Sequence, residues 1–267
     1  MTSHRKLSHG RIKPPAGSSV DWGDPINNKL ICKVIFAEGV TTNKAMNIAN
    51  RKLLTPTGAP TRQKTPFGLS PNGFSNTDYY STPCAIAQGS DVTVSWWQIV
   101  ANNAGSNTSA WGSDGADRLQ CHSPYSGTMY FDYPDSGTGR ITCGLGAGYD
   151  NKWVHLAAIG GAKYRALYIN GIKQAEDSVD VTSSFTSSHA NMGIGKWLGF
   201  ALSQAGAMDV FGVWTRQLKS PEIQRLYAEP FAGIQEPFNR RVTAAAAGGF
   251  RASSAYQNAQ VIGAGVF

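Results

Sequence analysis

The sequence has few of the residues that common enzyme classes require. Its glutamates are only five, and none stands in the E-x-D-x-x-E pattern that places paired carboxylates on one strand face. They are Glu38, Glu176, Glu222, Glu229 and Glu236. No G-x-S-x-G or H-E-x-x-H motif occurs, and the glycines at 144, 146 and 148 precede no predicted helix. These absences argue against hydrolytic chemistry and phosphate binding, so we predict a protein that is not an enzyme and uses no cofactor.

Cysteine is also scarce and widely spaced. The four cysteines, Cys32, Cys84, Cys121 and Cys143, form no C-x-x-C pair and no zinc-binding spacing with histidine. His122 follows Cys121 directly, and adjacent strand residues point to opposite faces, which makes them poor joint ligands. We therefore predict no metal site and four reduced, mostly buried thiols in a protein assembled in cytoplasm. A single disulfide, for example Cys121–Cys143, stays open as the alternative.

Long apolar runs and a broad basic surface are missing as well. Without about 18 consecutive apolar residues, no membrane span is expected, and the charged N-terminus lacks the apolar stretch of a secretory signal. Residues 1–89 hold 11 Lys and Arg against 4 Asp and Glu, whereas residues 90–230 hold 10 against 12. Because the body shows no basic stripe interleaved with aromatic residues, nucleic acid is not an expected partner.

What the sequence does contain is a series of short alternating runs separated by turn residues. KWVHLAAIGGAKYRALYINGIK, residues 152–173, predicts a hairpin turning at Gly160-Gly161 and a second tight turn at Asn170-Gly171. The other predicted strands lie at 29–37, 91–100, 118–122, 128–133, 140–144, 191–195 and 206–214, with a weaker one within 43–54. Residues 58–71 and 102–117 are predicted as turns and loop. This spacing is typical of an all-β sandwich.

One short helix is predicted near the end of this series. Ser220 is the expected cap, Pro221 the first helical residue, and Pro230 the stop. Glu222 then lies in the first turn, where a carboxylate complements the helix dipole. We expect it to be structural and not catalytic.

The hairpin and the helix segment together resemble the laminin-G-like, concanavalin A-like jelly roll. The family's W-x-H-h-A and LYINGIK motifs are matched by Trp153, His155, Ala157 and residues 167–173, and its later motif by Gly206, Asp209, Val213, Trp214, Arg216, Leu218, Glu222, Ile223, Leu226 and Tyr227. The resemblance covers about residues 25–230 and implies two antiparallel sheets, with His155 and Asp209 structural. Buried positions are expected at Trp153, Val154, Leu156, Leu167, Ile169, Val213 and Leu226. Many relatives carry a second Asp where Val210 stands, so we expect no calcium site.

Both ends of the chain differ in composition from this body. Residues 1–24 form a basic, Pro- and Gly-containing arm, and residues 231–267 a Gly/Ala-rich arm with many hydrophobic residues but no period. We predict that residues 1–24 and 243–267 become ordered on other chains, whereas residues 231–242 either pack back on their own domain or become ordered on a partner. The expected contacts to acidic protein surface are Arg5, Lys6, Arg11 and Lys13, and the expected anchors in partner grooves are Phe250, Tyr256, Ile262 and Phe267.

The layout of a jelly roll between two arms resembles virion proteins of tailed bacteriophages, and EPFAGIQEPFNRRV, residues 229–242, resembles the segment that closes such phage domains. It implies a non-enzymatic virion protein, either a capsid decoration (cement) protein or a tail-associated subunit. Its partners would be capsid or tail proteins and further copies of itself. The alternative is a glycan-binding adhesin module, tail or surface associated, that contacts a host glycan. Its candidate residues are Trp111, Asp114, Asp117, Tyr125 and Trp197.

Overall fold

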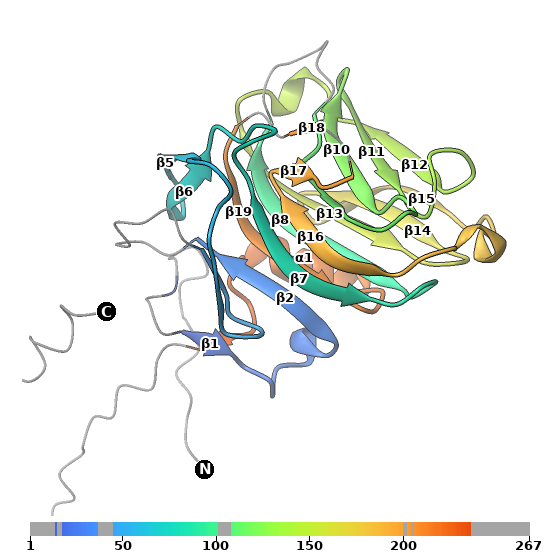
Figure 1. The fold of residues 1–267 in the computed structure, drawn as a ribbon, viewed down its shortest axis with the longest axis horizontal. Coiled ribbons are helices and arrows are strands. Elements are labelled where there is room, and N and C mark those ends of the chain that lie inside the picture. Colours follow the sequence, from blue (N-terminus) through green and yellow to red (C-terminus); the bar gives the residue numbers. More distant parts are fainter. Residues whose placement is uncertain are drawn as a thin grey trace, which may run out of the picture. The chain divides into compact units, whose positions relative to one another are not determined.

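Two eight-stranded sheets face each other in the computed structural model, which describes Pro14 and residues 18–36, 45–100, 108–199, 202–203 and 206–235 (Figure 1). The front sheet has the order β12-β11-β10-β9-β16-β7, with β17 and β18 attached at β9, and the back sheet the order β15-β14-β13-β8-β19-β2-β3-β4. Their paired strands are antiparallel except where β17 meets β9 in parallel. The predicted jelly-roll class is therefore confirmed.

Most of the predicted runs contain strands, but β7, β9, β17 and β18 lie where no strand was predicted. The front sheet contains β7 (Tyr80–Ile86), β9 (Trp111–Ser113), β10 (Gln120–Tyr125), β11 (Thr128–Asp132), β12 (Arg140–Gly144), β16 (His189–Ile194), β17 (Lys196–Trp197) and β18 (Leu202–Ser203). The back sheet contains β2 (Leu30–Ile35), β3 (Ala45–Asn47), β4 (Lys52–Leu54), β8 (Val92–Ile99), β13 (Trp153–Gly160), β14 (Arg165–Ile169), β15 (Ile172–Asp177) and β19 (Met208–Trp214). Within the described residues, three short 3-10 helices cover Pro25–Asn27, Ala147–Tyr149 and Thr182–Ser184.

The alternation of apolar residues explains where the core forms. Successive strand residues point to opposite faces, so Trp96 lies between the two sheets while Trp97 lies on the outer face of the back sheet. Val154, Leu156, Leu167, Ile169, Val213 and Leu226 are buried as predicted, whereas Trp153 is half-buried. Each face of the back sheet therefore has its own apolar cluster.

The turn between β14 and β15 has the backbone that its sequence predicts. Asn170 and Gly171 both adopt positive φ, 50° and 77°, which is the requirement of a two-residue type I′ turn. A Cβ on Gly171 would lie 3.2 Å from Tyr227 Cβ, so this turn also packs closely on the helix.

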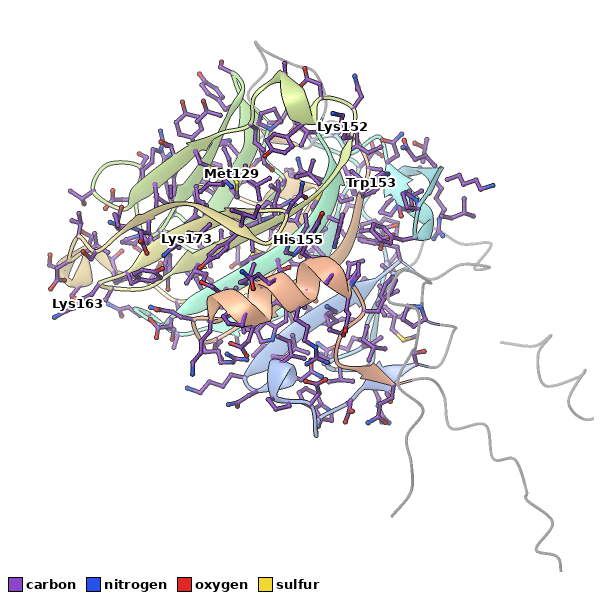
Figure 2. All side chains as sticks on the ribbon, turned by 180° about the vertical axis from the view of Figure 1, so that it is seen from behind. Met129, Lys152, Trp153, His155, Lys163 and Lys173 are labelled. Atoms are coloured by element: carbon purple, nitrogen blue, oxygen red, sulfur yellow. The ribbon has the colours of Figure 1, made fainter. Side chains whose placement is uncertain are left out.

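That helix, α1 (Ser220–Ala228), covers the outer face of the back sheet. It crosses the strands in the foreground of Figure 2, beside the labelled His155. The helix begins one residue earlier than predicted, because Lys219 is its cap and donates its N–H to the Glu222 carboxylate (2.8 Å). Ser220 Oγ instead bonds the Tyr168 hydroxyl of β14 (2.9 Å), which fixes the helix to the sheet.

Three sequence-based expectations need correction. Residues 58–71 contain a hairpin, β5 (Thr61–Thr65) with β6 (Gly68–Asn72), and the predicted loop 102–117 contains β9. The N-terminal arm was predicted to include residues 18–24, but β1 (Ser19–Val20) pairs with β20 (Ile234–Gln235) and belongs to the body. Residues 231–235 pack on their own domain, which is one of the two alternatives left open for them, and Val20, Phe231 and Ile234 are buried. Apolar side chains at these positions complete the cluster under α1.

Candidate functional site

The outer face of the front sheet is the surface that α1 leaves free. Register places Gly112, Gln120, Asp132 and Arg140 in one row across β9, β10, β11 and β12. Directly opposed residues share a face, and the next row holds His122, Tyr130 and Thr142. Here we call "the front face" the surface made by Arg118, Gln120, His122, Tyr125, Tyr130, Asp132, Arg140 and Trp197.

At its centre a buried carboxylate is held by a guanidinium. Arg140 donates from Nε to Asp132 Oδ1 (2.6 Å) and from Nη2 to Oδ2 (2.8 Å). The Gln120 side-chain amide donates a third bond to Oδ2 (2.6 Å), and Arg118 Nη1 lies 3.5 Å from the same oxygen. Asp132 is fully buried. A buried carboxylate requires such partners, so its oxygens are committed to the structure.

His122 extends this network as a neutral ring. Its Nδ1 lies 3.0 Å from the Thr108 carbonyl oxygen, which can only accept, so Nδ1 carries the proton. Nε2 then accepts from the Gln120 amide (2.9 Å). Burial lowers the pKa of His122 below its ordinary value. The ring is therefore uncharged at neutral pH, and it fixes the orientation of the Gln120 side chain.

Trp197 packs closely on β9 because Gly112 has no side chain at the point of contact. A Cβ on Gly112 would meet Trp197 Cδ1 at 2.4 Å, so only a residue without one admits the ring. The guanidinium carbon of Arg118 stands 5.4 Å from the centre of the Trp197 ring, within cation–π range. The indole thus positions Arg118 beside Asp132.

Two tyrosines complete the front face. Tyr125 is 39% exposed and meets Tyr130 edge to face, with 5.7 Å between ring centres. The Arg140 guanidinium lies 5.0 Å from the Tyr130 ring centre. Half-exposed aromatic rings next to oriented donors are the combination that stacks on and hydrogen-bonds a polar ligand with an apolar side.

The predicted glycan-binding residues occupy very different places. Tyr125 and Trp197 both lie on the front face, although Trp197 is only 6% exposed. Trp111 is fully buried between the sheets, 5.5 Å from the Trp96 ring centre and 6.0 Å from that of Phe131. The expectation that Trp111 stacks on a sugar is wrong, because its side chain points inward from β9.

Asp114 and Asp117 hold neighbouring loops together. Asp114 accepts from the N–H groups of Ala190 and Asn191 and from the Asn191 amide. Asp117 accepts from Thr186 and from the Ser187 N–H. Burial alone would raise the pKa of Asp117, but these hydrogen bonds outweigh it and lower the pKa. Both carboxylates are therefore used within the fold.

The remaining predictions concern the arms, the cysteines, metal binding and membrane spans. Arg5, Lys6, Arg11, Lys13, Phe250, Tyr256, Ile262 and Phe267 lie outside the described residues. All four cysteines are free thiols, and strand register places Cys121 opposite Phe131 but Cys143 opposite Met129, too far apart for a disulfide. Within the described segments, no group of three His, Cys, Asp or Glu side chains could hold a metal ion. None of the helices described there has the length and apolar character needed to cross a bilayer.

Two residues of the family motifs are enclosed beneath or beside the back sheet. His155 is fully buried, bonds Ser95 Oγ through Nε2 (2.9 Å), and has a pKa lowered to about 3 by burial and by the charge of Lys33. Asp209 is fully buried and accepts from the Ser70 hydroxyl of β6 and from the Val210 N–H. Both side chains are buried and hydrogen-bonded within the domain, as expected for structural residues.

The front face could have been recognised in the sequence from the polar and aromatic residues that alternate along three predicted strands. Gln120 and His122, Tyr130 and Asp132, and Arg140 and Thr142 are spaced two apart, each pair on a predicted strand. They alternate with Cys121, Phe131 and Ile141, which point into the core. Polar and aromatic residues with period two indicate an elaborated outer face, but only the register aligns the three strands.

Comparison with known families identifies the fold. Residues 74–224, more than half of the chain, match the family model described as the concanavalin A-like lectin/glucanases superfamily. The chain belongs to this superfamily. A search of curated proteins finds no match.

Several solved structures share the superfamily fold at low identity. The binding domain of Paraclostridial Mosquitocidal Protein 1 is 14% identical, with a TM-score of 0.57 over 78% of this chain and 53% of that one. The receptor binding domain of botulinum neurotoxin C/D mosaic serotype is 12% identical, with a TM-score of 0.57 over 75% and 51%. The ligand binding domain of botulinum neurotoxin serotype D, in complex with N-acetylneuraminic acid, is 12% identical, with a TM-score of 0.54 over 75% and 51%. This chain spans about half the length of each.

Proposed function

We propose that this chain is a non-enzymatic carbohydrate-binding module whose site is the front face. The observation that carries the proposal is the half-exposed Tyr125–Tyr130 pair beside two guanidiniums that are held in place from below. Aromatic faces pack against the C–H side of a sugar ring, while fixed N–H donors bind its oxygens. Membership of a superfamily of lectins and glucanases supports this choice of ligand.

Binding without hydrolysis is supported by the state of the central carboxylate. Glycoside hydrolysis uses two carboxyl groups, about 5–10 Å apart, on either side of the scissile bond. Asp132 is fully buried and bonded by Arg140 and Gln120, so it is not available as an acid or a nucleophile. We therefore expect bound oligosaccharides to be recovered intact after prolonged incubation with the protein.

A glycan array followed by calorimetry tests the site. Tyr125→Ala should weaken the affinity for the best array ligand at least tenfold, because a central aromatic contact contributes about 1.4 kcal/mol or more. Trp22→Ala is the matched control, since Trp22 is 61% exposed and closely follows β1 in the chain. β1 lies at the opposite side of the domain from β10, β11 and β12 (Figure 1). Equal losses in both variants, or no loss in Tyr125→Ala, would remove the front face as the site.

We also propose that the module is carried on the virion of a tailed bacteriophage, in homo-oligomeric form and attached through its terminal arms. This proposal is supported by the composition of those arms. The first is basic and the second is rich in hydrophobic residues, and neither has a periodic pattern that would form a core of its own. Deleting residues 243–267 should leave a folded, glycan-binding domain that no longer joins particles. Normal incorporation of the truncated protein would contradict it.

A further inference from the structure

The front face carries more positive than negative charge. Of the residues that define it, Arg118 and Arg140 are positively charged and Asp132 is negatively charged. Burial lowers the pKa of His122, so its neutral ring contributes no positive charge to the front face. One guanidinium is thus matched by a carboxylate and the other is in excess.

Arg118 is the guanidinium in excess. Its contact with Asp132 is long, 3.5 Å, because the oxygens of that carboxylate already accept from Arg140 and Gln120. Its side chain is 36% exposed and rests on Trp197, which holds the planar group without using its N–H donors. An oriented guanidinium with free donors favours two-pronged contact with an anionic group.

The neighbouring arginine also has donors to spare. Arg140 donates to Asp132 from Nε and from one Nη2 hydrogen, and its side chain is 30% exposed above Tyr130. Tyr125 and Tyr130 lie next to it in the following rows of the sheet. A ring stacked on the tyrosines would therefore place a substituent toward the two arginines.

From this arrangement we infer that the front face selects acidic glycans, in which an anionic substituent pairs with Arg118 while the sugar ring packs on Tyr125 and Tyr130. The inference rests on the proposed carbohydrate-binding function and adds the class of ligand. A carboxylate and a sulfate share the chemistry that Arg118 would recognise, and separate probes distinguish them.

The test compares sugars that differ only in charge. Calorimetry on the full chain uses 3′-sialyllactose against lactose, trigalacturonic acid against its methyl ester, and a sulfated against an unsulfated lactose. At least one acidic probe should bind about tenfold more tightly than its neutral partner, the usual gain from a charge-assisted bond. That preference should shrink as ionic strength rises from about 0.02 M to about 0.5 M. Equal affinities within all three pairs would overturn the inference.

Arg118→Gln then assigns the preference to one side chain. It removes the charge but leaves Arg140 and Gln120 on Asp132, so the melting temperature should change little. Affinity for the acidic probe should fall about tenfold and affinity for its neutral partner should stay unchanged. Arg51→Gln, the same change at an exposed position in the β3–β4 turn, is the control.

The two proposals fail in different ways. An unchanged acidic preference in Arg118→Gln would overturn the role of Arg118 while sugar binding itself stood. Neutral sugars bound as tightly as acidic ones would overturn the selectivity and keep the proposed function. Absence of binding to any sugar, on the array and in solution, would remove the proposed function and this inference together.

Discussion

Gly112→Ala tests whether the Trp197 ring organises the front face. The added methyl group would stand 2.4 Å from Trp197 Cδ1 and 2.7 Å from Cγ, well inside van der Waals contact. Gly112 cannot move away easily, because β9 is hydrogen-bonded between β10 and β16. The indole must therefore leave its position, and Arg118 loses the ring on which it rests.

The expected cost follows from overpacking. Extra carbon atoms forced into a packed site typically cost 1–3 kcal/mol, so we expect the free energy of unfolding to fall by about 2 kcal/mol. For a domain of this size that corresponds to a melting temperature about 4–8 °C lower. Urea unfolding followed by circular dichroism measures the first quantity, and calorimetric melting measures the second.

A double-mutant cycle shows whether the indole is responsible. In a Trp197→Ala background the indole carbons are gone and the Cβ of residue 197 stays 2.9 Å from the added methyl group, so Gly112→Ala should then cost much less than in the native protein. The two changes should be coupled by at least about 1 kcal/mol. Equal destabilisation in both backgrounds, or no effect in the native one, would refute the packing argument.

Two further predictions concern the region under α1. The pKa of His155 is lowered from 6.5 to about 3 in the native state. As pH falls below about 6.5 the unfolded chain therefore binds a proton at His155 that the native protein does not bind. The free energy of unfolding should then decline by up to about 1.4 kcal/mol per pH unit. Urea titrations between pH 7 and pH 4 should show a shallower slope in His155→Gln, and an unchanged slope would refute this assignment. Glu222 bonds Arg216 through both oxygens (2.6 and 2.9 Å) and the Lys219 N–H, so Glu222→Gln should cost about 1 kcal/mol and leave glycan affinity unchanged; a loss of binding or of any hydrolase activity in that variant would contradict a structural role.

Much of the fold was predictable because it depends on local patterns. Trp96 and Trp97 separate onto two faces by strand geometry alone, and Asn170-Gly171 specifies its turn through positive φ. The hairpin at residues 61–72 was missed because Arg62, Lys64 and their neighbours are exposed or half-exposed and give no apolar alternation. Its position depends instead on tertiary contacts. Ser70 donates to Asp209, and the buried Phe67 ring packs against the rings of Trp97, Trp153 and Phe231.

The site was only partly predictable for a related reason. Tyr125, Trp111 and Trp197 were proposed on equal terms, and the sequence alone did not separate the buried Trp111 from the two residues that lie on the front face. The direction of β9 sends Trp111 into the core, while the parallel contact of β17 with Gly112 places Trp197 outside. Such a distinction requires strand register across the sheet.

The pairing of β1 with β20 determines how the domain responds to mechanical load. Ser19 lies opposite Gln235 and Val20 opposite Ile234, so the incoming and outgoing chain meet at one end of a two-rung antiparallel ladder. A pull between the two ends opens these rungs one after the other, as a zipper does, and does not shear them all at once. Under tension we therefore expect the β1–β20 pair to separate first, which exposes Val20 and Ile234 before the strands of either large sheet are strained.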